Sequence, residues 1–196
     1  MTTDQETTII NKINDGDTQA FAVLVDRYKD LVFTLALRMI KNREEAEEVA
    51  QDTFIKVFTA LPRFKGDSKL STWIYKVAYN SCLDRIRKNK RGVDEVGIDS
   101  FTEHQIKTVD NALDALEEKE QQQTIQHCLQ QLASKDSFLL TLFYFEELSL
   151  EEISQIVNME PNTVKVNIHR ARKRLATVLK QHLEPEIIQC YERERN

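Results

Sequence analysis

The segment from residue 148 to residue 175 carries the pattern that most limits how this chain can fold: two short amphipathic helices separated by a tight break. Ser149 is suited to cap the first helix, and Glu152 stands three residues later, which is the spacing of a capping box. Asn158 falls at the break, where Asn tolerates a left-handed backbone, and Pro161 suits the first turn of the second helix. Two capped helices joined this closely are typical of a helix-turn-helix.

The second of these helices is basic over most of its predicted surface, and no acidic residue occurs between Pro161 and Lys180. Its apolar residues recur at helical spacing and form a stripe: Val164, Ile168, Ala171, Leu175 and Val178. In a helix-turn-helix, a basic second helix lies in the major groove of DNA. The alternative is an ordinary solvated amphipathic helix. The paired caps and the single sign of charge favour the DNA-binding interpretation.

Composition predicts a folded all-α protein. The chain has 196 residues, enough for one large or two small domains, with 41% hydrophobic and 30% charged residues. Periodic helical runs dominate, and no convincing alternating strand occurs. There is no apolar run of membrane-spanning length and no signal-peptide pattern at the N-terminus, so we expect a cytoplasmic protein without membrane insertion. The three cysteines lie far apart without zinc-site spacing, which predicts a reduced, intracellular setting and no metal: Cys82, Cys128 and Cys190.

Charge is unevenly distributed along the chain, although the net charge is only −5. Residues 83–91 are basic, the helix after Pro161 is basic, and residues 92–120 between them are acidic. We interpret residues 92–110 as a flexible acidic linker. The opposed charges also suggest the hypothesis that the two halves pack against each other in the free chain and hide both DNA-binding faces.

Helical periodicity divides the chain into two small helical domains, residues 5–91 and 111–182. In the first, a helix begins after Asp17, and a second is capped by Asn42, ends at Pro62 and carries Phe58 on its apolar side. Ser71 or Thr72 opens a third helix. The predicted fold class is therefore all-α, with a helical bundle, a linker and a helix-turn-helix domain.

Several segments of the chain resemble the bacterial sigma-70 family. The pattern resembles the family's second region at Ala20-Phe, Arg27-Tyr28, Glu45–Phe54, Phe64-Lys-Gly66, Ser71-Thr-Trp73 and Ala78-Tyr-Asn80. Leu132–Leu179 resembles the fourth region, and the absence of a third-region domain is typical of the small extracytoplasmic-function (ECF) group. The resemblance covers roughly residues 17–91 and 120–180. It implies a transcription initiation factor that binds core RNA polymerase and directs it to promoters, and it implies neither an enzyme nor a cofactor.

The resemblance also implies three sets of site residues. Contact with the coiled coil of the largest polymerase subunit is implied for Glu47, Glu48, Gln51, Asp52 and Ile55. Recognition of the melted minus-10 strand is implied for Phe64, Lys65, Lys69, Trp73, Tyr75, Asn80, Arg85, Arg87 and Arg91. Recognition of the minus-35 duplex is implied for Asn162, Thr163, Lys165, Val166, His169, Arg170, Arg172 and Lys173. Further implied partners are the polymerase flap and an anti-sigma factor.

Alternatives remain open for some of these residues and for the whole chain. Trp73 and Phe64 suit core anchors as well as base contacts, and His169 suits a solvated position as well as a DNA contact. Val166 departs from the family, which more often has a small polar residue there. A plain helix-turn-helix regulator is the second functional candidate. An enzyme has little support, because the chain has no Gly-rich phosphate loop, HExxH motif or nucleophile elbow.

Overall fold

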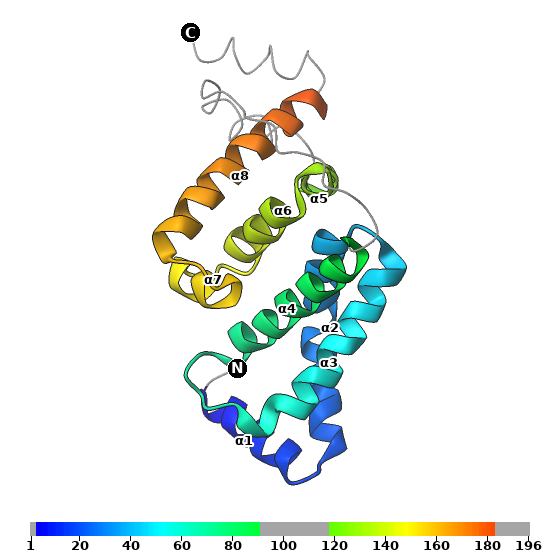
Figure 1. Ribbon diagram of the computed structural model, residues 1–196, viewed down its shortest axis with the longest axis vertical. Helices are drawn as coiled ribbons and strands as arrows, with labels where there is room; N and C mark the ends of the chain where they lie inside the picture. The colour runs from blue at the N-terminus through cyan, green and yellow to red at the C-terminus, as the bar shows by residue number, and fades with distance from the viewer. Residues whose placement is uncertain (1–2, 91–117, 183–196) are drawn as a thin grey trace.

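The computed structural model describes residues 3–90 and 118–182, and every element in these ranges is helical (Figure 1). The predicted linker 92–110, Arg91 and residues 111–117 lie outside the described residues. The elements are α1 (Thr3–Asn14), α2 (Thr18–Ile40), α3 (Arg43–Ala60), the 3₁₀ turn η1 (Leu61–Arg63), α4 (Leu70–Lys90), α5 (Glu118–Gln131), α6 (Ser134–Leu140), the π-helical turn η2 (Thr141–Phe145), α7 (Leu150–Val157) and α8 (Pro161–His182). The predicted all-α fold is confirmed.

The N-terminal half is a bundle of α2, α3 and α4, with α1 packed on α2 and η1. The Asp17 carboxylate caps α2 by accepting hydrogen bonds from the backbone N–H groups of Gln19 and Ala20. Asn42 caps α3 by accepting from the N–H of Glu45. These caps were predicted, whereas α1 was not. The core of the bundle includes the fully buried Val32, Leu35, Val57, Leu70 and Ile74.

The C-terminal half is formed by α5, α6, α7 and α8, and local chemistry sets the boundaries of its helix-turn-helix. Ser149 Oγ accepts from the N–H of Glu152, and Glu152 Oε2 accepts from the N–H of Ser149, so the predicted capping box is confirmed. Asn158 ends α7 in the left-handed region at φ 54° and ψ 53°. The chain then enters α8 at Pro161.

The two halves pack against each other, with α4 against α7 and α2 against α6 (Figure 1). The rings of Tyr79 and Phe138 meet across this contact at a centroid distance of 4.9 Å. Buried apolar residues from both halves form one continuous hydrophobic cluster. Burial of apolar surface is therefore the main stabilising term of the domain contact.

Basic side chains at the end of α2 reach across the same contact. Arg38 is only 5% exposed, and its guanidinium donates to the backbone carbonyl and the side-chain oxygen of Gln126. Its Nε has no hydrogen-bond partner, and burial lowers the pKa of Arg38. Lys41, which ends α2 with a left-handed backbone, donates from Nζ to the carbonyl of Leu132 at 2.5 Å. The contact thus includes a cation that has lost most of its hydration.

Within residues 3–90 and 118–182, no helix is both long and apolar enough to cross a bilayer.

Candidate nucleic-acid interfaces

The solvent-facing side of α8 gathers most of the residues predicted to contact duplex DNA. Val164, Ile168 and Ala171 are buried against the rest of the domain and fix which side of the helix faces outward. The exposed residues on the outer side are Asn162, Thr163, Lys165, Val166, His169, Arg170 and Arg172, and Lys173 is half-buried. The hypothesis that domain packing hides both DNA-binding faces is therefore wrong for α8, whose outer face stays exposed in the packed arrangement.

Two of these α8 residues differ from the rest. Arg172 Nη1 donates to the Tyr144 hydroxyl at 3.3 Å, so its guanidinium is turned toward η2. Val166 is an apolar residue with 47% of its surface exposed. The remaining outer residues supply the cations and hydrogen-bond donors that contacts to phosphates and base edges require.

The loop from Phe64 to Lys69 leads into α4 and carries the first residues predicted to contact melted DNA. The rings of Phe64 and Trp73 pack at a centroid distance of 5.2 Å, and both side chains are half-buried. The two rings thus anchor the ends of the loop, while each side chain keeps part of its surface in contact with solvent. Lys65 is exposed, and Gly66 has a φ of 77°, which disfavours a side chain at that turn.

Lys69 and Tyr75 face the C-terminal half. Lys69 Nζ lies 2.8 Å from Glu152 Oε1, and this hydrogen bond lowers the pKa of Glu152. Tyr75 is 4% exposed, and its hydroxyl donates to Glu146 Oε2 at 3.3 Å. Burial raises the pKa of Tyr75 and also that of Glu146. Two residues predicted to contact the minus-10 strand are therefore held by carboxylates of the other domain.

The remaining predicted minus-10 residues lie farther along α4. Asn80 and Arg87 are exposed, and Arg87 Nη1 lies 3.5 Å from Asp84. Arg85 pairs with Glu48 at 2.7 Å and with Glu45 at 3.7 Å, so α3 carboxylates neutralise its guanidinium. Hence the structure does not bring Arg85 and Arg87 together with Lys69 and Tyr75 in one cluster.

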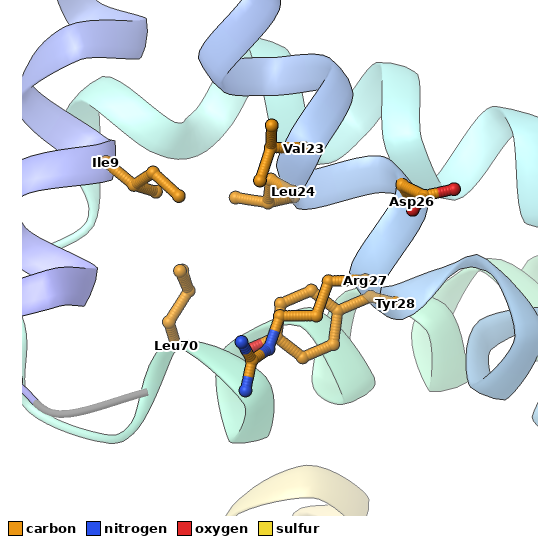
Figure 2. Close-up of a pocket in the computed structure, with 7 residues that line it drawn as sticks. All are labelled: Ile9, Val23, Leu24, Asp26, Arg27, Tyr28 and Leu70. Carbon is orange, nitrogen blue, oxygen red and sulfur yellow. The ribbon is translucent and has the colours of Figure 1, made fainter.

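A cavity of about 180 Å³ lies between α1, α2 and the start of α4, beside this loop (Figure 2). Ile9, Leu24 and Leu70 form its apolar wall, and the Arg27 guanidinium lies 6.0 Å from the centroid of the Tyr28 ring at its rim. Leu70 is fully buried, and its N–H donates to Glu6 of α1 at 3.3 Å. The helix α1, which the sequence interpretation missed, thus helps to fix where the loop ends and α4 begins.

The residues predicted to contact polymerase share one exposed face of α3. Glu47, Glu48, Gln51, Asp52 and Ile55 are all exposed, and Ile55 reaches 64%. Phe58, expected on the apolar side of this helix, is 48% exposed and packs edge-on against Phe21 at 4.8 Å. This face combines carboxylates with exposed apolar side chains, a composition suited to protein contact.

Comparisons with known proteins match both halves of the chain to regions of the same family. Residues 24–92 match the family described as Sigma-70 region 2, and residues 122–175 match Sigma-70, region 4. The ECF RNA polymerase sigma factor SigW of Bacillus subtilis is 38% identical over 177 residues, covering 87% of this chain and 95% of that protein. The RNA polymerase sigma-H factor of Pseudomonas aeruginosa is 31% identical over 185 residues, covering 91% of this chain and 96% of that protein.

Two solved structures share the fold. The sigma factor RpoE in complex with the anti-sigma factor NepR from Bartonella quintana matches with a TM-score of 0.61 and 24% identity, covering 82% of this chain and 96% of that one. CnrH in complex with the cytosolic domain of CnrY matches with a TM-score of 0.59 and 20% identity, covering 89% of this chain and 96% of that one. The likeness extends over both helical halves.

Proposed function

The chain belongs to the extracytoplasmic-function group of the sigma-70 family, and from that premise we propose which of its surfaces carry out promoter recognition. It is a transcription initiation factor that binds core RNA polymerase and directs it to specific promoters, and it is not an enzyme. The observation that carries the assignment of surfaces is the outer face of α8, which is exposed and lined with cations while its opposite face is buried.

The outer face of α8 reads the minus-35 element as duplex DNA. Lys165, Val166, His169 and Arg170 contact base edges, and Arg170 is suited to bidentate hydrogen bonding with a guanine. The phosphate contacts come from Asn162, Thr163, Arg172 and Lys173. Phosphate contacts position the helix, and base contacts give it sequence preference. The left-handed turn at Asn158 supports this assignment, because it ends α7 and sets the direction in which the chain enters α8.

The loop at residues 64–69 and the first turns of α4 bind the melted minus-10 strand. Phe64 and Trp73 offer aromatic rings for bases to stack on, and Lys65 and Lys69 offer positive charge to the phosphate backbone. Tyr75, which the packed arrangement buries, belongs to the same proposed site, and the backbone of the strand farther along is contacted by Asn80, Arg85, Arg87 and Arg91. The factor favours opening of the duplex because it binds the opened strand more tightly than the paired one.

This assignment requires the two halves to separate. In the packed arrangement the Glu152 carboxylate forms an ion pair with Lys69, and the Glu146 carboxylate accepts a hydrogen bond from the buried Tyr75. A DNA strand carries negative charge of its own and cannot share these groups with carboxylates. We therefore include in the proposal that the α4–α7 contact opens when the chain engages polymerase and promoter.

The exposed face of α3 binds the coiled coil of the largest polymerase subunit. Its carboxylates are suited to a basic partner, and Ile55 adds apolar surface that contributes to affinity when buried. The flap of the polymerase is the second contact, made by the C-terminal half. Polymerase works in the cytoplasm, and we place the chain there.

An anti-sigma factor is the remaining proposed partner. The two solved structures of like fold are complexes, one with the anti-sigma factor NepR and one with the cytosolic domain of CnrY. By analogy, we propose that a protein of this kind holds the present chain away from polymerase.

The decisive experiment titrates the purified chain into core RNA polymerase and transcribes a pool of genomic fragments, with the 5′ ends of the RNA mapped. We expect tight binding to core and a shared two-block motif upstream of the new start sites. If the chain fails to bind core but binds DNA alone, the proposal is wrong and a simple helix-turn-helix regulator takes its place.

A further inference from the structure

Val166 occupies an unusual position for an apolar side chain. It lies near the centre of the outer face of α8, between Asn162 and Thr163 one turn before it and His169 and Arg170 one turn after it. All four neighbours are polar and exposed. Val166 itself is 47% exposed and does not belong to the hydrophobic cluster or to the residues packed on it.

Stability of the domain gives no reason for a valine there. A β-branched side chain loses rotamer freedom in a helix, and exposed apolar surface gains nothing from contact with water. A small polar residue or alanine would suit an isolated helix at least as well. The apolar surface of Val166 is therefore available to a binding partner rather than to the core.

The floor of the major groove offers one apolar group to such a side chain. Thymine presents a C5-methyl there, whereas the other bases present donors and acceptors that an isopropyl group would leave without a hydrogen-bond partner. The proposed minus-35 assignment brings this face of α8 into the groove. We propose that Val166 packs on the C5-methyl of a thymine and makes this chain require a thymine in its minus-35 element.

The neighbours restrict where that thymine stands. Arg170 follows Val166 by one helical turn, a rise of about 6 Å along the helix axis. Base pairs are spaced about 3.4 Å apart, so the base contacted by Arg170 lies within roughly two base pairs of the thymine.

The test removes one methyl group from the DNA and leaves the protein unchanged. Holoenzyme assembled from the full chain and core RNA polymerase first selects duplexes from a promoter library randomised in the upstream element. Each thymine of the selected element is then replaced singly by deoxyuridine, which lacks the C5-methyl. We expect one such replacement to weaken binding roughly fourfold, the effect of one buried methyl group.

Variants of the protein test whether Val166 causes this loss of DNA affinity. Val166→Ser should bind thymine and uracil duplexes equally, whereas Val166→Ile should keep the discrimination. Val23→Ser, at a similarly exposed valine on α2, should behave like the unchanged chain. Thermal unfolding of each variant, compared with the unchanged chain, separates a lost contact from a lost fold.

The outcomes distinguish this inference from the function on which it rests. If the holoenzyme selects no upstream motif, the minus-35 assignment is wrong and this inference is wrong with it. If a motif is selected but no thymine is methyl-sensitive, or if Val166→Ser keeps the sensitivity, only the role of Val166 is wrong.

Discussion

Lys69 Nζ lies 2.8 Å from Oε1 of Glu152, while Oε2 of the same carboxylate accepts the hydrogen bond that completes the cap of α7. One side chain thus stabilises the start of the helix-turn-helix and joins it to the loop proposed to bind the melted strand. A local element of one domain is thereby coupled to the proposed DNA-binding surface of the other.

Substituting Glu152→Gln should loosen the domain contact without destroying the cap. Glutamine still accepts a hydrogen bond in a capping box, but it loses its charge and with it the ion pair to Lys69. We expect a larger fraction of molecules with separated halves, measured by single-molecule energy transfer between dyes on α3 and α8. Glu151→Gln, at the exposed residue just before it, is the matched control and should leave the distribution unchanged.

The packed arrangement should be more stable in mild acid than at neutral pH. Because burial raises the pKa of Glu146, the packed state binds a proton more tightly than the open state does. The contribution of the Glu146 carboxyl to the stability of the packed arrangement is fully present below the ordinary carboxyl pKa of about 4.3. It is lost as the pH rises through the raised pKa of Glu146 in the packed state. Energy transfer at picomolar concentration checks this, since the pI of about 5.5 favours precipitation of concentrated samples.

The variant Glu146→Gln should remove most of that pH dependence. The amide oxygen still accepts the hydrogen bond from Tyr75, and no charge has to be buried. At neutral pH we expect more molecules in the packed arrangement than in the unchanged chain. An equal pH dependence in the variant would show that another group is responsible.

Substitution of Asn158 by alanine should destabilise the chain more than substitution by glycine. Its φ of 54° is in the left-handed region, which costs alanine about 1 kcal/mol more than it costs glycine or asparagine. Asn158→Ala should therefore lower the free energy of unfolding by about 1 kcal/mol, and Asn158→Gly should leave it within a few tenths. Urea denaturation of the two variants, in parallel, measures the difference. Equal effects would contradict the role given to this turn.

Binding to core polymerase should depend on Ile55. Removing its apolar side chain with Ile55→Ala should weaken binding by about tenfold, because an exposed residue in the proposed contact loses roughly 1–2 kcal/mol of burial. Val23→Ala, at a valine that is 58% exposed on α2, is the control and should bind normally. Fluorescence titration with core polymerase, without DNA, provides the measurement. Equal affinity of both variants for core polymerase would contradict the proposal that this face of α3 contacts polymerase.

Features set by local chemistry could be predicted from the sequence. The caps at Asp17, Asn42 and Ser149 and the turn at Asn158 each depend on a few neighbouring residues, and the structure has them as expected. The helix α1 was missed, because its first half is polar and only Ile9, Ile10 and Ile13 provide an apolar side.

Long-range contacts could not be predicted in the same way. Tyr75 and Glu146 are separated by 71 residues, and nothing in the periodicity of either helix indicates that they pair. Phe58 follows the apolar spacing of α3, yet it is 48% exposed and packs only against the edge of Phe21. The roles given to the site residues stay predictions, since sequence pattern and exposure indicate where a partner can bind but not which partner does.

The buried guanidinium of Arg38 bears on how readily the packed chain opens to bind polymerase. Its unpartnered Nε costs free energy in the packed arrangement and offsets part of the stabilisation that the apolar contact between the halves provides. A preference of about 1 kcal/mol for the packed form would weaken the apparent affinity for polymerase only about sixfold. At that preference about one molecule in six is open at any moment, so the packed form lowers the occupancy of polymerase without preventing binding.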